Sequence, residues 1–260
     1  MICYTRNFED VMLQRVFADV PKGNYLDVGA SLPVEDSNTY ALYQQGWRGV
    51  AMEPLPLEKF WRQNRPEDVF LNVAVGAQPG NVTLHVFDAA QLCSAMPDTV
   101  VHWAQHGREP LGNIQVSCVT LNQVVDEHLP DHELHILSID VEGMEHEVLK
   151  GLDLSRHRPW VIVLEVVLPG STTQSPHSWE PDLLAAGYLD AYFDGVNRFY
   201  LARERGHLLE RFSLPPNVWD GIVLASQLAL QQENENLKAE LTSLRETQSR
   251  LSNAQTGSQA

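Results

Sequence analysis

The chain is short of basic residues. Of its 260 residues, 18 are Lys or Arg and 34 are Asp or Glu, which gives a formal net charge of −16 at pH 7. A protein that binds nucleic acid needs a basic face to neutralise phosphates, and docking on an anionic membrane requires charge of the same sign. The composition therefore argues against a nucleic-acid partner and against an anionic membrane surface.

Long apolar runs and cysteine pairs are also missing. No run approaches the roughly 20 residues that span a bilayer, so we expect no integral membrane segment. Residues Met1–Arg6 lack the apolar centre of a signal peptide. The three cysteines, Cys3, Cys93 and Cys118, are odd in number and have no metal-type spacing. We therefore expect reduced thiols in a cytoplasmic protein.

The apolar residues that are present suffice for one large α/β domain with an appendage, since 43% of the chain is hydrophobic. Apolar stretches of strand length alternate with segments of helical period. Strands are expected at 25–28, 48–53, 69–76, 82–87, 116–119, 134–140, 160–167, 188–193 and 198–202, and helices at 8–20, 36–45, 56–64, 120–129, 144–150 and 179–186. Residues 89–113 show no clean period and are interpreted as a mobile cover over a site.

The stretch Tyr25–Ser31 is typical of the first strand–turn unit of a nucleotide-type site. A short buried strand carries an acid, Asp27, near its end, and Gly29 follows in the turn. Glycine permits a ligand to approach the backbone closely, and the Asp27 carboxylate offers acceptors to a ligand amine or hydroxyl. An ordinary structural turn explains a single glycine equally well, because the Gly-x-Gly-x-x-Gly pattern is incomplete.

The second strand also ends in an acid. Glu53 lies 26 residues after Asp27, and Pro54 stops the strand because proline cannot donate to a ladder. Rossmann-like domains bind the two ribose hydroxyls of an adenosine with a carboxylate at this place. A strand-end acid without a ligand is the simpler alternative. Asn72, near the end of the third strand, either reaches an adenine edge or ties down a loop.

Further acids follow the buried strands of the second half. Asp140 and Glu142 stand at the mouth of strand 134–140, which we expect beside the first strand, at the switch point where open α/β sheets bind ligands. Glu165 lies within the apolar strand 160–167, where an unpaired charge is costly. Glu165 therefore serves either a site or a structural salt bridge.

The last two expected strands predict the sheet type. Segments 188–193 and 198–202 are joined by Asp194–Asn197, which is the pattern of an antiparallel hairpin. About five βα units closed by such a hairpin are typical of class I methyltransferases, whereas a dehydrogenase would continue in parallel. The predicted fold class is therefore α/β with a class I methyltransferase, Rossmann-like sheet.

Leucines recur every seven residues near the carboxyl end of the chain. They are Leu230, Leu237, Leu244 and Leu251, and the other seam position holds Gln227, Asn234, Leu241 and Gln248, of which the two glutamines weaken the seam. Leu at position d with Asn at position a is typical of a parallel two-stranded coiled coil, so we expect a homodimer through this helix. A solitary amphipathic helix or a linker is the alternative.

Six motifs in this order resemble the FkbM family of S-adenosylmethionine-dependent methyltransferases. They are Asp27-Val28-Gly29-Ala30, Gly46-Trp47-Arg48-Gly49, Glu53-Pro54, Asn72-Val73-Ala74-Val75-Gly76, Ile139-Asp140-Val141-Glu142-Gly143-Met144-Glu145 and Asp194-Gly195-Val196-Asn197-Arg198-Phe199-Tyr200. The resemblance implies a class I methyltransferase fold and O-methylation of a hydroxyl, often on a sugar of a bacterial polysaccharide or on a secondary metabolite. We expect a family domain at 1–222, a coiled-coil helix at 223–252 and a disordered tail at 253–260.

With S-adenosylmethionine as the implied cofactor, the first turns of the sheet form the expected cofactor site. Asp27 and Gly29 would hold its amino-acid end, with Ala30 and Ser31 in the same turn, although Asn is more usual in the family at the place of Ser31. Two further contacts are expected, from Ser37 to the carboxylate of the cofactor and from Glu53 to its ribose.

The expected chemistry lies with Asp140, because a sugar hydroxyl is a poor acid and needs a base or a metal. Asp140 is the first candidate, with Glu165 and Asp194 as partners, and these three acids could also hold Mg²⁺ through oxygen ligands. His177 is a second candidate base. Two residues of the last hairpin, Asn197 and Arg198, are candidates for contact with the sugar or glycan acceptor.

Two other functions compete with this hypothesis. The first is a methyltransferase-like scaffold without activity in a glycan-assembly complex, against which the presence of Asp27, Glu53 and Asp140 weighs. The second is a nicotinamide oxidoreductase, which is disfavoured because Ser31-Leu32-Pro33 stand where phosphate-cradling glycines would follow Gly29.

Overall fold

A seven-stranded sheet forms the centre of the protein. The computed structural model describes residues 1–89, 92–129, 133–168, 171, 173–174 and 178–257, with the side chains of 249–257 left aside. Across the sheet the strands are β10 (Tyr188–Phe193), β11 (Asn197–Ala202), β9 (Val161–Glu165), β8 (Ile136–Ile139), β2 (Asn24–Val28), β3 (Arg48–Met52) and β4 (Val69–Leu71). Strand β11 is antiparallel to both of its neighbours, and the other neighbouring strands are parallel. The chain therefore has the α/β class that its sequence predicts.

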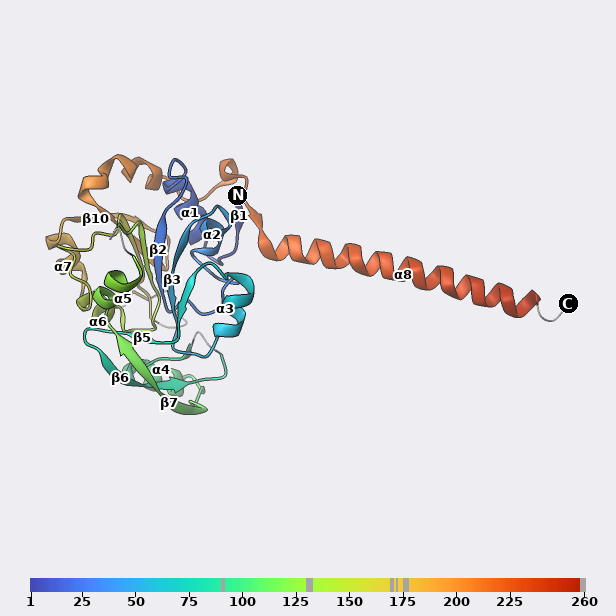
Figure 1. Ribbon diagram of the computed structural model, residues 1–260, viewed down its shortest axis with the longest axis horizontal. Coiled ribbons are helices and arrows are strands. Elements are labelled where there is room, and N and C mark those ends of the chain that lie inside the picture. Colours follow the sequence, from blue (N-terminus) through green and yellow to red (C-terminus); the bar gives the residue numbers. More distant parts are fainter. Residues whose placement is uncertain (90–91, 130–132, 169–170, 172, 175–177, 258–260) are drawn as a thin grey trace.

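Helices cover both faces of this sheet (Figure 1). They are α1 (Glu9–Val16), α2 (Tyr40–Gln44) and the 3₁₀ segment η2 (Arg203–Phe212) on one face, and α5 (Leu121–His128), α6 (Glu145–Lys150) and α7 (Glu180–Ala185) on the other. Another helix, α3 (Glu58–Asn64), contacts β4 at the end of the sheet.

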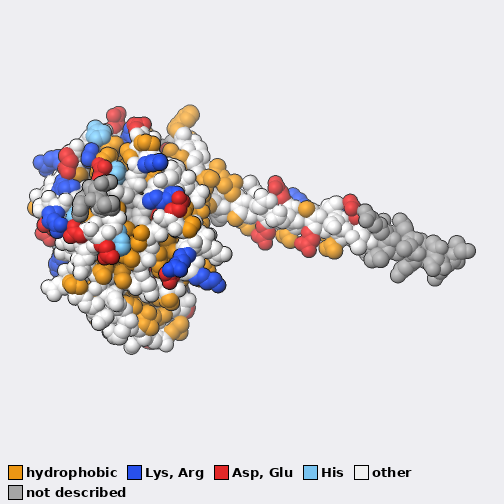
Figure 2. All heavy atoms as spheres, in the orientation of Figure 1, with side chains coloured by type: hydrophobic (Ala, Val, Ile, Leu, Met, Phe, Trp, Pro, Cys, Tyr) orange, Lys and Arg blue, Asp and Glu red, His pale blue; other side chains and the backbone are white. Residues whose placement is uncertain are grey.

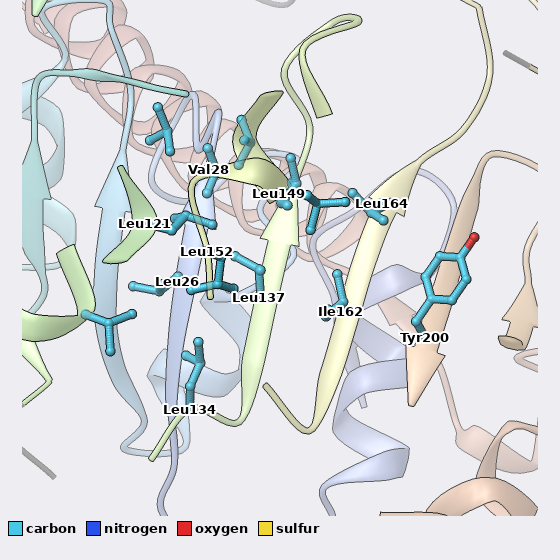
Figure 3. Packing of buried hydrophobic residues seen from close by; sticks show 14 of the residues in the cluster. Leu26, Val28, Leu121, Leu134, Leu137, Leu149, Leu152, Ile162, Leu164 and Tyr200 are labelled. Carbon is cyan, nitrogen blue, oxygen red and sulfur yellow. The ribbon is translucent and has the colours of Figure 1, made fainter. Parts of the chain in front are cut away.

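Alternation along the strands divides the core between the two faces. Leu26 and Leu137 pack in one cluster with α5, α6 and α7, while their neighbours Tyr25 and Ile136 pack in the other with α1, α2 and η2. Successive side chains of a strand point to opposite faces, so strands that are apolar throughout need a helical layer on each side. Figure 3 shows the first cluster, with Leu26, Leu137 and Ile162 lying side by side on neighbouring strands.

The third expected strand, 69–76, is interrupted. Its first part is β4 of the large sheet, and its last part is β5 (Ala74–Val75) of a separate sheet with the order β5, β7 (Gly112–Val119), β6 (Gly80–Val86). The backbone turns between the two parts, where the Val73 amide donates to the Leu71 carbonyl at 3.0 Å. One expected strand thus serves two sheets, and the break follows Leu71, at the polar residue Asn72.

Two expected segments differ in extent. The helix expected at 36–45 begins only at Tyr40, because Asp36 has a left-handed backbone with φ 56° and the Ser37 hydroxyl accepts from the Tyr40 amide. The segment 89–113, expected to be an irregular cover, contains the helix α4 (Pro97–Gln105). Residues 90–91 lie outside the described residues.

The amino-terminal end of the chain lies at the base of a long helix. Strand β1 (Ile2–Cys3) pairs in parallel with β12 (Val223–Leu224), which follows η3 (Val218–Asp220) and leads directly into α8 (Ala225–Gly257). Helix α8 projects away from the body (Figure 1). It extends to Gly257, which lies within the segment that we expected to be a disordered tail from residue 253. Within the described residues, no helix combines the length and apolar character needed to cross a bilayer.

Candidate active site

A cavity of about 410 Å³ opens where β2, β3 and β8 end. Its size lies in the usual range of small-molecule sites. One part of the wall is polar and includes Gly29, Ser31, Glu53, Asp140 and Glu142. The other part is apolar and includes Val73, Val75, Val82, Leu84 and Met144. Residues of both sheets thus line the cavity. The large sheet supplies polar lining residues at the ends of its strands, and the small sheet supplies apolar ones.

The floor of the cavity is the place where β2 and β8 come together. The Asp140 amide donates to the Val28 carbonyl at 3.0 Å, and Gly29 has a φ of 76°. A Cβ atom on Gly29 would lie 2.9 Å from the carbonyl carbon of Asp140. The group that approaches Gly29 closely is therefore the Asp140 carbonyl of the chain itself, whereas we expected a ligand to approach there. Gly29 still lines the cavity, so a contact with a cofactor stays a prediction.

Glu53 is held with its carboxylate at the cavity wall. It is only 6% exposed, and its two oxygens accept from the backbone amides of Ser31 at 3.0 Å and Leu55 at 2.9 Å. Burial raises the pKa of Glu53, and the two amide donors act in the opposite direction. Each oxygen retains a lone pair, so this carboxylate can accept further hydrogen bonds from a pair of hydroxyls.

Asn72 and Ala30 support the loops beside the cavity. The Asn72 amide donates to the carbonyls of Glu53 at 2.9 Å and Leu55 at 2.8 Å, which is the loop-tying role that we weighed against adenine contact. Ala30 is buried and packs in a small cluster with Trp61. Neither residue is among those that line the cavity, so both cofactor contacts stay predictions.

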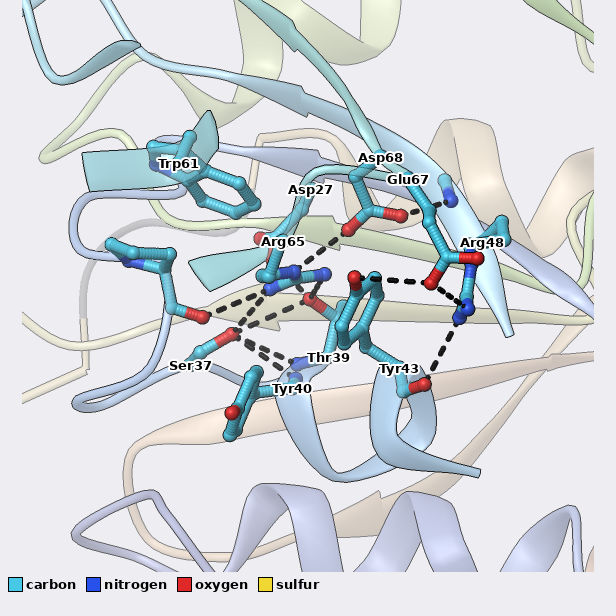
Figure 4. Close-up of polar contacts among 12 residues, drawn as sticks. Asp27, Ser37, Thr39, Tyr40, Tyr43, Arg48, Trp61, Arg65, Glu67 and Asp68 are labelled. Carbon is cyan, nitrogen blue, oxygen red and sulfur yellow. Dashed lines mark hydrogen bonds and ion pairs between the residues drawn. The ribbon is translucent and has the colours of Figure 1, made fainter. Parts of the chain in front are cut away.

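Asp27 and Ser37 belong to a buried polar network (Figure 4). Asp27 accepts from the Thr39 hydroxyl at 2.7 Å, and burial raises its pKa. Ser37 accepts from the Arg65 guanidinium at 3.1 Å. Neither Asp27 nor Ser37 is among the lining residues. The structure gives each a partner within the chain, and their predicted contacts with the cofactor are untested.

Arg65 is the centre of this network, and the sequence did not reveal it. Its side chain is 1% exposed and lies at the end of α3. The guanidinium donates to Asp68 at 2.7 Å, to the Tyr25 hydroxyl at 2.6 Å and to the Thr39 hydroxyl at 2.9 Å. A buried cation is stable only when paired and fully hydrogen-bonded, so Arg65 links β2, α2 and α3 into one unit.

Three acids lie close together beside the cavity, and two of them, Asp140 and Glu142, line it. Carboxylate oxygens of Asp140, Glu142 and Glu165 lie within 4.8 Å of one another. Burial, together with the neighbouring acids, raises the pKa of Glu142 to about 9 and that of Glu165 to about 11. Glu165 and Asp140 share a hydrogen bond, which lowers the pKa of Asp140 and raises that of Glu165, whereas desolvation raises the pKa of Asp140 overall. A hydrogen bond between two carboxyl groups requires a proton, so this pair shares one proton while the bond is made.

The third acid of this group differs from our prediction. We expected Asp194 with Asp140 and Glu165, and the structure has Glu142 in that place. Asp194 instead accepts from the amides of Val196 at 2.8 Å and Asn197 at 2.6 Å, closing the turn of its own hairpin. Short polar side chains often bond their own turn in this way, and sequence spacing does not distinguish that use from a ligand role.

The remaining predicted residues are placed as follows. Asn197 is buried and donates to Glu9 at 2.8 Å, and Arg198 pairs with Asp190 on β10. Neither lines the cavity, so their contact with an acceptor stays a prediction. His177 lies outside the described residues.

Comparison with known proteins decides the family. The model described as Methyltransferase FkbM domain matches residues 27–202, which is more than half of the chain. The chain belongs to the FkbM methyltransferase family. Searches of curated proteins and of solved structures gave no match. Membership implies S-adenosylmethionine as the methyl donor, and the matched range contains β2, β3, β8 and the cavity that they open.

The cavity of this FkbM domain suits that donor. Oxygen Oε2 of Glu142 is buried, and within the described part of the chain it has no hydrogen-bond partner. S-adenosylmethionine carries an amine, whose N–H groups can donate to a carboxyl oxygen of this kind. The paired acceptors of Glu53 suit two ribose hydroxyls, and the apolar end suits a flat base. The sequence placed Glu142 beside Asp140 at the ligand-binding edge of the sheet, but we assigned Glu142 no role in the site.

Proposed function

We propose that this FkbM protein is an O-methyltransferase that uses S-adenosylmethionine and acts on a hydroxyl of a sugar in surface-polysaccharide or glycan biosynthesis. One observation carries the proposal. Asp140 lines the same cavity as Glu53, and one of its carboxylate oxygens lies within 4.8 Å of those of Glu142 and Glu165. A proton acceptor thus lies next to the carboxylate that suits a ribose.

The bound cofactor supplies an activated methyl group, whose transfer requires in-line alignment with the acceptor oxygen. A sugar hydroxyl must lose its proton as the bond forms. Although Asp140 is exposed at the cavity, desolvation beside the neighbouring acids raises the pKa of its carboxyl, which makes the carboxylate a stronger base than an ordinary aspartate. Glu165 does not line the cavity, and its hydrogen bond holds the Asp140 carboxylate in place. Asp140 is therefore the proposed base and Glu165 a positioning residue.

Mg²⁺ is an alternative occupant of the same acids. Asp140, Glu142 and Glu165 offer oxygen ligands of the kind that Mg²⁺ prefers. The raised pKa values of Glu142 and Glu165 mean that both groups hold protons at neutral pH, and a cation would have to displace them. This cost favours the base over the metal. Activity that is unchanged after treatment with EDTA would agree with this assignment.

Two substitutions separate binding from chemistry. We expect Asp140→Asn to bind S-adenosylmethionine like the parent in calorimetry and to lose methyl transfer by about 10² to 10⁴-fold. We expect Glu53→Gln to lose affinity by about tenfold, because a Gln amide cannot accept at both oxygens. Matched controls are Asp182→Asn on α7 and Glu58→Gln on α3, whose side chains are 77% and 56% exposed. Full activity of Asp140→Asn would refute the assignment of the base.

The calorimetry also tests the competing scaffold function, because a scaffold need not bind the methyl donor. Transfer from labelled S-adenosylmethionine to a panel of sugars, with phenols and amines for comparison, tests the acceptor class. The unpaired thiols of Cys3, Cys93 and Cys118 support a cytoplasmic location, which is part of the same proposal. A homodimer through α8 is also part of it, since α8 carries the leucine heptads.

A further inference from the structure

Helix α8 exposes a seam of leucines over most of its length. Leu230, Leu237 and Leu244 are 58%, 55% and 60% exposed. Figure 2 shows hydrophobic and charged side chains along the projecting helix, away from the body. Isolated helices gain little stability in water, because most helical stability comes from packing an apolar face. The seam is therefore a surface for a partner.

The charged residues beside the seam follow the same seven-residue period. With the leucines at position d, Glu233 and Glu240 occupy position g, and Lys238 and Arg245 occupy position e. All four side chains are exposed and make no ion pair in the part of the chain that the structure describes. Their charges are available for contacts with another helix.

We propose that α8 pairs with α8 of a second copy of this chain as a parallel, in-register two-stranded coiled coil. In that arrangement position g of one helix lies beside position e of the next heptad on the other. Glu233 then faces Lys238 of the second copy, and Glu240 faces Arg245 of the second copy. Every such contact joins opposite charges, so the surface is complementary to itself.

The antiparallel arrangement brings together like charges instead. In that arrangement position g of one helix faces position g of the other, so glutamates lie beside glutamates. Position e faces position e, so the basic residues Lys238 and Arg245 of one copy lie beside basic residues of the other. Asn234 at position a also favours the in-register parallel pair, in which it meets its own equivalent across the seam. The charges at positions e and g and the Asn234 side chain at position a therefore both favour the parallel orientation.

The base of α8 fixes the helix to the catalytic domain. The N-terminal amine donates to the carbonyl of Gly221 at 2.9 Å, and Arg15 of α1 pairs with Asp220 at 2.5 Å. Strand β12, which precedes α8 directly, pairs with β1. A parallel pair of α8 helices therefore carries both catalytic domains at the same end of the coiled coil.

Charge reversal in the full chain tests the pairing. Analytical ultracentrifugation of the parent at micromolar concentration should give twice the 29.2 kDa mass of one chain. The variant E233K/E240K should be monomeric, and so should K238E/R245E, because each puts like charges together at every g–e contact. An equimolar mixture of the two variants should restore the dimeric mass. The control E235K/E246K makes the same charge change at positions away from the seam and should stay dimeric.

Cysteine cross-linking tests the register. Leu237→Cys should form an interchain disulfide on mild oxidation, because equivalent d residues meet in a parallel in-register pair and lie within disulfide reach. Gln232→Cys, on the outer face of α8, should give no more cross-linking than the parent. A monomeric or trimeric parent, a dimer unaffected by E233K/E240K, or equal cross-linking of the two cysteine variants would overturn the proposal.

Discussion

The carbonyl group of Asp140 occupies the space that a side chain at Gly29 would need. A Cβ atom there would lie 2.9 Å from the Asp140 carbonyl carbon, and Gly29 has a φ of 76° that L residues rarely adopt. The turn after β2 and the end of β8 are thus fitted against each other at the cavity floor. The same backbone contact holds Asp140 beside the turn that supplies Ser31.

Gly29→Ala should therefore destabilise the protein far more than an ordinary glycine substitution. Gly46→Ala is the matched control, because Gly46 has a φ of 94° and no atom within 4 Å of an added Cβ. We expect Gly46→Ala to lower the free energy of unfolding by about 1 kcal/mol through backbone strain alone. Gly29→Ala adds the clash and should lower it by about 4 kcal/mol or more. Urea denaturation measures both, and equal losses would contradict the close fit.

The polar end of the cavity could largely be predicted from the sequence. Glu53 and Asp140 follow buried strands, and the carboxyl ends of parallel strands meet at one edge of a sheet, so both acids reach the same cavity. The pairing of β8 with β2 follows the same logic and is confirmed. The period of the apolar residues and the position of an acid at a strand end are local features of the sequence. They suffice here because the order and direction of the strands decide which edge of the sheet binds a ligand.

Contacts set by tertiary structure could not be predicted. Arg65 looks like any helix-end arginine, and only the packing of α2 and α3 against β2 buries it. Asp194 follows a strand just as Asp140 does, yet it bonds its own turn. The segment 69–76 divides between two sheets at Asn72, a single polar residue that does not by itself predict a change of sheet. In each case the deciding partner is distant in the sequence or depends on local backbone angles.

Arg65→Met should be strongly destabilising, because it leaves Asp68 buried without its cation. Both side chains of this pair are fully buried at a separation of 2.7 Å. Breaking such a pair costs about 3–5 kcal/mol. Arg62→Met, on the same helix, is the control, because its pair with Glu58 is exposed and should contribute less than about 0.5 kcal/mol. Similar unfolding midpoints for the two variants would show that the network contributes little.

Glu9 should make the stability of the protein depend on pH. Burial raises its pKa from 4.5 to about 7, Asp194 adds to the rise, and its carboxyl accepts from Asn197 at 2.8 Å and from the Asn7 amide at 3.2 Å. A carboxyl whose folded pKa is raised favours the folded state while it is protonated. That contribution is complete below pH 4.5 and is lost as pH rises through about 7.

Glu9→Gln should therefore flatten the pH profile. We expect the fall in unfolding free energy between pH 5 and pH 8 to shrink by up to about 3 kcal/mol relative to the parent, because Gln has no proton to lose. Any change in hydrogen bonding with Asn7 is independent of pH and shifts the whole profile without altering its slope. Glu204→Gln is the control, because Arg158 lowers the pKa of Glu204 and leaves it ionised across this range. Urea titrations at each pH give the slopes, and an unchanged slope in Glu9→Gln would mean that Glu9 titrates like an exposed carboxyl.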